Sequence, residues 1–190
     1  MTEIIGTLNE HPLHAALKQH YAQDEGLQEV SVGGYFVDVV YKKQLIEIQT
    51  QNFYAIRRKI IELITNNLVR LVYPIASEKW LLKLSQEAGG EPVRRKSPKR
   101  GQTYQVFDEL VSFPELIEHP NFALDIAMVN VEEVRRYTGK KPWRQNGWET
   151  VEQRLIKVVE IVSVERSVDL LALLPETLPV KFTSRDLEES

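Results

Sequence analysis

The segment from Val37 to Thr50 constrains this chain more than any other, because it predicts a β-hairpin that carries two acidic residues. Valine, isoleucine and tyrosine dominate on both sides of Lys42-Lys43, a composition typical of two strands joined by a polar turn. A loop of two or four residues gives the same register, in which Asp38 lies opposite Glu47. An odd-length loop would shift this register and separate the two acids.

The predicted pairing of Asp38 with Glu47 has two interpretations. Facing Cβ atoms lie roughly 4.5–5.5 Å apart, so two like charges there are destabilising unless a positive group lies between them. A divalent cation is the simplest such group. The alternative is an ordinary pair of acids on a solvent-exposed face. The two-residue alternation of a strand favours burial, because Asp38 shares its face with Phe36 and Val40.

Helices are expected on both sides of this hairpin. Upstream, Asn9 can cap a helix that accommodates Pro12 in its first turn. Glu10 then lies at the start of this helix, either as a favourable helix-dipole charge or as a third acid directed at the hairpin. Downstream, Gln51-Asn52 precedes a second amphipathic helix. The apolar stripes of the two helices are Leu13, Ala16, Leu17 and Tyr21, then Phe53, Ile56, Ile60, Leu63 and Ile64.

With a strand near 29–32 and another at 68–74, the predicted order is helix, three strands, helix, strand. Over about residues 8–76 this order resembles the core of the PD-(D/E)XK nuclease superfamily, the restriction-endonuclease-like fold. In the resemblance, Asp38 matches the Asp of the motif and Glu47 its second acid. Gln49 stands where a Lys is usual, and Glu10 matches the optional acid of the first helix. The whole chain is also similar to uncharacterised bacterial proteins with this core and a C-terminal winged-helix segment.

The resemblance implies a Mg²⁺-dependent phosphodiesterase acting on DNA. Asp38, Glu47 and the backbone carbonyl of Ile48 would hold Mg²⁺ or Mn²⁺, which prefer oxygen ligands. Gln49 could orient the attacking water but could not supply the charge of a Lys. The alternative is a catalytically decayed module of the same fold that binds nucleic acid or a protein partner.

Composition sets further limits on this interpretation. The chain has 190 residues and no cysteine, which excludes disulfides and thiolate metal sites and favours a cytoplasmic location. It shows no apolar run long enough to span a membrane. Its net charge of −3 means that nucleic-acid affinity must come from a local patch. One patch is expected in a mobile loop and consists of Arg94, Arg95, Lys96, Lys99 and Arg100. The oligomeric state is left open between monomer and homodimer.

The C-terminal third predicts a second unit. A strand is expected over 122–129, and Lys140-Lys141-Pro142 marks a boundary between an α/β domain (1–140) and a helical C-terminal segment (141–190). In that segment Trp148, Val151, Leu155, Val158, Val159 and Val162 follow helical spacing. Thr183 and Asp186 have the spacing of a capping box. They would begin a winged helix that is truncated at Ser190.

Overall fold

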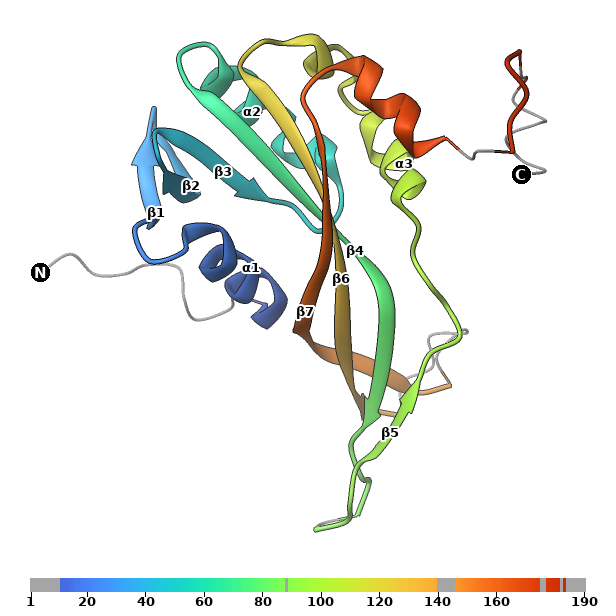
Figure 1. The fold of residues 1–190 in the computed structure, drawn as a ribbon. Coiled ribbons are helices and arrows are strands. Elements are labelled where there is room, and N and C mark those ends of the chain that lie inside the picture. Colours follow the sequence, from blue (N-terminus) through green and yellow to red (C-terminus); the bar gives the residue numbers. More distant parts are fainter. Residues whose placement is uncertain (1–10, 88, 140–145, 175–176, 182, 184–190) are drawn as a thin grey trace, which may run out of the picture.

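The computed structural model describes residues 11–87, 89–139, 146–174, 177–181 and 183. They form a mixed α/β fold in which helices flank one central sheet (Figure 1). In chain order the elements are α1 (Pro12–Ala22), β1 (Leu27–Val32), β2 (Tyr35–Tyr41), β3 (Gln44–Ile48), α2 (Phe53–Ile64), β4 (Leu68–Lys83), β5 (Val93–Lys96), η2 (Thr103–Gln105), α3 (Val106–Leu110), η3 (Pro114–Glu118), β6 (Phe122–Tyr137), β7 (Trp148–Val164) and η4 (Ser167–Leu173).

The sheet has the strand order β1-β2-β3-β4-β6-β7, with β5 paired to the far half of β4. The pairs β3–β4 and β4–β6 are parallel, and the other pairs are antiparallel. The predicted order of elements from α1 to β4 is therefore confirmed. The parallel β3–β4 connection requires a crossover, which α2 supplies.

The predicted β2–β3 hairpin is confirmed together with its register. Val39 pairs with Ile46 and Tyr41 pairs with Gln44, across a two-residue turn of Lys42 and Lys43. Both lysines have positive φ, of 47° and 67°. Two positive φ values are the requirement of the type I′ turn, whose twist matches that of paired strands.

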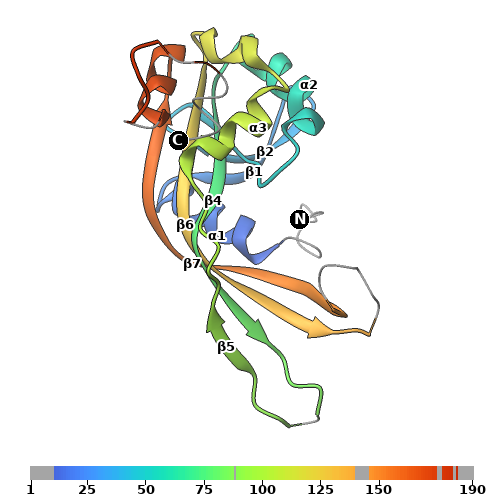
Figure 2. The same ribbon diagram turned by 90° about the vertical axis from the view of Figure 1, so that its right-hand side faces the viewer.

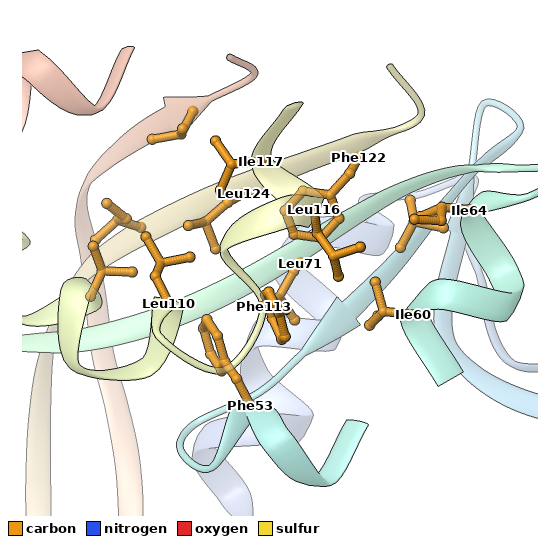
Figure 3. Packing of buried hydrophobic residues seen from close by; sticks show 14 of the residues in the cluster. Phe53, Ile60, Ile64, Leu71, Leu110, Phe113, Leu116, Ile117, Phe122 and Leu124 are labelled. Atoms are coloured by element: carbon orange, nitrogen blue, oxygen red, sulfur yellow. The ribbon is translucent and has the colours of Figure 1, made fainter. Parts of the chain in front are cut away.

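The two faces of the sheet carry separate apolar clusters. α1 packs on one face, where Leu13 and Leu17 contact Ile46 and Ile48 within one cluster. α2, α3 and η3 pack on the other face, where Phe53 stacks on Phe113 with ring centroids 5.2 Å apart (Figure 3). Since alternate residues of a strand face opposite sides, Glu47 of β3 faces α2.

The prediction of a helical C-terminal segment is wrong for residues 148–164. These residues form β7, a strand of 17 residues that pairs with β6 from Trp148 to Val164. The apolar spacing was a poor guide because valines are so frequent here that they fit both the helical repeat and the two-residue repeat of a strand. Their β-branched side chains favour a strand. The expected boundary at Lys140-Lys141-Pro142 and the winged-helix start after Thr183 lie outside the described residues.

Strands β4 and β6 are much longer than the sequence predicted, with 16 residues each. The C-terminal half of each strand extends beyond the helices. Together with β5 and the first half of β7, these two halves form an arm. Figure 2 shows this arm extending below the helices, and within it β4 stays paired with β6 as far as Lys83 and Arg135. The basic segment is thus part of the sheet at Val93–Lys96, where a mobile loop was expected.

The N-terminus of α2 is capped by a residue more than fifty positions away. The Glu109 carboxylate of α3 accepts hydrogen bonds from the backbone N–H groups of Asn52 and Phe53, at 3.0 and 2.9 Å. Asn52 is the N-cap residue of α2, but its side chain makes no cap bond. The carboxylate both satisfies free N–H groups and complements the helix dipole.

We expect Glu109→Ala to lower the free energy of unfolding by about 1–2 kcal/mol, the usual cost of losing a cap. Urea denaturation measures this loss. The adjacent exposed acid provides the control, since Asp108→Ala should change the same free energy by less than about 0.5 kcal/mol. Equal effects of the two changes would contradict a capping role for Glu109.

Candidate active site

The predicted acids lie where the pairing of β2 with β3 ends, on two strands inside the sheet. Asp38 Oδ2 accepts a hydrogen bond of 2.8 Å from the backbone N–H of Ile48. It also lies 3.2 Å from His14 Nε2, a nitrogen that is 3.1 Å from the Ile48 carbonyl oxygen. Because a carbonyl oxygen only accepts, Nε2 must carry the hydrogen. One imidazole N–H of α1 thus holds two of the oxygens predicted to bind the metal.

Glu47 is held from the other face of the sheet. Its side chain is buried, and Lys59 Nζ of α2 lies 2.6 Å from Glu47 Oε1. Among the described residues, no hydrogen bond of ordinary angle satisfies this buried oxygen. The pattern of the hairpin alone did not reveal this partner, because Lys59 lies on α2, twelve residues beyond Glu47.

The two carboxylates differ in their affinity for protons. Burial, followed by the negative charge of Asp38, raises the pKa of Glu47 to about 7, against the opposing effect of Lys59. Burial also disfavours the charge of Asp38. This effect of burial is outweighed by the hydrogen bonds from His14 and Ile48 and by the charges of His14 and Lys59. The pKa of Asp38 is therefore held below its usual range. A buried pair of acids with divergent proton affinities is a recognised mark of functional sites.

Gln49, one of the two other predicted catalytic residues, does not join this pair in the described structure. The Gln49 side chain donates hydrogen bonds to the carbonyl oxygens of Gln51 and Asn52, in the loop that leads into α2. Gln49 therefore shapes that loop. Glu10 lies outside the described residues. In the described part of the chain, no three His, Asp or Glu side chains stand close enough together to coordinate one metal ion as they are.

A cleft of about 840 Å³ opens beside His14. One wall is formed by α1 and by the loop after β3, at Thr50 and Gln51. The other wall is the bend of the sheet where the arm begins, and it includes Glu133 and Thr150. The volume is within the range of small-molecule sites. The cleft therefore reaches His14, the residue of α1 that contacts Asp38.

The predicted basic patch is partly neutralised by neighbouring acids. Arg94 pairs with Glu132 at 2.7 Å, and Lys96 and Arg100 both contact Glu78. Arg94 and Lys96 also flank the ring of Trp80, 5.3 and 5.2 Å from its centroid. Arg95 and Lys99 are exposed.

Charge is nevertheless distributed unevenly along the chain. Residues 76–101 contain 7 Lys and Arg against 3 Asp and Glu, whereas the remainder contains 17 against 24. The β4–β5 part of the arm is thus positive within a negative protein.

Comparison with known proteins places the chain in a family. A family model described as a domain of unknown function, DUF8091, matches residues 11–165. The chain belongs to the DUF8091 family. The matched region includes all the strands described here and Asp38, Glu47, Lys59 and His14. An uncharacterized protein from Treponema pallidum (strain Nichols) is 28% identical over 187 residues, which is 98% of this chain and 74% of that relative. No solved structure gives a significant match.

In the described part of this DUF8091 chain, no helix has the length and apolar character required to cross a bilayer.

Proposed function

We propose that this protein is a metal-dependent nuclease of the PD-(D/E)XK type, with DNA as its substrate. The observation that carries the proposal is the buried Glu47 carboxylate beside Asp38, on adjacent central strands within an order of elements that resembles that superfamily. The restriction-endonuclease-like fold is part of this proposal. So is the assignment of Arg94, Arg95, Lys96, Lys99 and Arg100 to nucleic-acid binding.

The residues present suit Mg²⁺ or Mn²⁺. Two carboxylates and the Ile48 carbonyl are hard oxygen donors, and Glu47 Oε1 is a buried oxygen without a good hydrogen bond among the described residues. When bound, the ion would lower the pKa of a water molecule and stabilise charge on the scissile phosphate. His14 and Lys59 now contact the carboxylates, so ion binding requires them to give way.

The reaction is hydrolysis of a phosphodiester. The oxygen of water forms a bond to phosphorus, one P–O bond to a sugar breaks, and the departing oxygen takes up a proton. The products are a phosphate monoester and a hydroxyl group. In this step Asp38 and Glu47 position the reacting groups, and the buried setting strengthens their electrostatic effect. The positive β4–β5 arm would contribute phosphate contacts that weaken with salt.

The test combines metal binding with cleavage. We expect Mn²⁺ to stabilise the wild-type protein by about 3 kcal/mol at a hundred times the dissociation constant. We also expect it to support cleavage of single-stranded, duplex or branched DNA. Glu47→Gln should abolish both effects, whereas Glu62→Gln, a change of an exposed acid on α2, should preserve both. A wild-type protein that neither binds Mn²⁺ nor cleaves any of these substrates would refute the proposal.

A second candidate function is a binding module without catalysis. It is favoured by the protein side chains that already accompany each carboxylate, His14 at Asp38 and Lys59 at Glu47. On this hypothesis the positive arm binds nucleic acid and the acid pair needs no metal. DNA binding that is unchanged by EDTA, with no stabilisation by Mn²⁺, would support this alternative.

A further inference from the structure

The proposed nuclease site lacks a cation at the position where the sequence places Gln49. An uncharged amide cannot supply electrostatic stabilisation to a phosphate that gains negative charge during hydrolysis. The Gln49 side chain is also committed elsewhere, since it donates to the carbonyl oxygens of Gln51 and Asn52. A positive group must therefore come from another element if the site is active.

Lys59 meets this requirement from α2. Its ammonium contacts Glu47 Oε1 and also donates a hydrogen bond to the carbonyl oxygen of Phe36, two residues before Asp38. It is thus anchored between the two acid-bearing strands. The side chain is 18% exposed, whereas that of Arg58 beside it is 88% exposed and pairs with Glu62 one turn later. Lys59 is the cation that α2 directs at the acid pair, while Arg58 belongs to the helix surface.

We infer that Lys59 is the catalytic cation of this site and takes the role that Gln49 cannot fill. The inference rests on the proposed nuclease function. Without metal, Lys59 is the counter-ion of Glu47. If Glu47 held a divalent ion, that ion would supply the counter-charge, and the Lys59 ammonium would be free to contact a phosphate oxygen of the substrate. A lysine stem allows this small movement because it is long and flexible.

Three variants test the inference, each examined for Mn²⁺ affinity by calorimetry and for DNA cleavage. Lys59→Met removes the charge and keeps an unbranched stem. Lys59→Arg keeps the charge. Arg58→Met is the matched control on the adjacent, exposed position. Circular dichroism and thermal unfolding verify that each variant is folded.

We expect Lys59→Met to bind Mn²⁺ severalfold more tightly, because a competing cation is gone, yet to cleave DNA about 100-fold more slowly. Lys59→Arg should recover a measurable part of that rate, and Arg58→Met should match wild type in both measurements. A merely structural lysine would instead weaken Mn²⁺ binding and the rate together on substitution by Met, and that result would overturn the inference.

Cleavage by Lys59→Met at a rate within about threefold of wild type would also overturn it. Both of these results for Lys59→Met are compatible with Mn²⁺-dependent cleavage by the wild-type protein. They would therefore refute the role of Lys59 without refuting the proposed function. A wild-type protein that binds no Mn²⁺ would refute the nuclease proposal and the inference together.

Discussion

Metal-free protein should lose roughly 3 kcal/mol of its unfolding free energy as the pH rises from about 4.5 to about 8, through the titration of Glu47. The pKa of this residue is raised in the folded protein to about 7, from an ordinary value of 4.5. The folded state therefore binds more protons than the unfolded state between these values. The stabilising contribution of protonated Glu47 is complete below pH 4.5 and is lost as the pH passes 7. At about 1.4 kcal/mol per pKa unit, the difference gives the stated size.

Two variants separate this effect from the general pH response of the protein. Glu47→Gln should flatten the decline, since the amide does not titrate. Asp38→Asn should shift the decline to lower pH, because the charge of Asp38 is the second cause of the raised pKa of Glu47. Urea denaturation in EDTA at intervals across this range provides the measurement. A decline in Glu47→Gln as steep as in wild type would show that other groups cause it.

Arg70→Met should cost about 3–5 kcal/mol, the usual result of removing one partner of a buried ion pair. Arg70 contacts Asp125, a residue of β6 that is only 4% exposed, and Asp125 also accepts hydrogen bonds from Tyr21 (3.1 Å) and Ser163 (2.7 Å). The network joins α1, β4, β6 and β7. Without the guanidinium, the carboxylate stays buried with only neutral donors.

The effect of Arg70 can be compared with that of an exposed ion pair. Arg57 pairs with Glu115, and both side chains are more than 40% exposed. Arg57→Met should therefore change the unfolding free energy by less than about 1 kcal/mol. Adding Asp125→Asn to Arg70→Met should restore part of the loss, because it removes the uncompensated charge. Equal effects of Arg70→Met and Arg57→Met in chemical denaturation would rule out a buried role for Arg70.

Features that depend on neighbouring residues were predictable from the sequence. The register that places Asp38 opposite Glu47 follows from the even-length turn at Lys42-Lys43 and from the alternation of apolar residues. The observed pairs Val39–Ile46, Val40–Leu45 and Tyr41–Gln44 have this register, and the pairing ends just before Asp38 and Glu47. The helix over Phe53–Ile64 follows equally from its apolar spacing and is observed as α2. Both are decided by interactions within about fifteen residues, which the order of residue types reveals.

Only the tertiary structure decided the partners of the acids and the conformation of the C-terminal strand. The contacts of Asp38 with His14 and of Glu47 with Lys59 join a strand to a helix on each face of the sheet. No periodicity in the sequence reports such a contact, because it depends on how helix and sheet pack. Residues Trp148–Val164 have apolar spacing that suits a helix, yet they form β7. Their backbone hydrogen bonds are satisfied by β6, the preceding strand, and the spacing of residue types does not reveal that pairing.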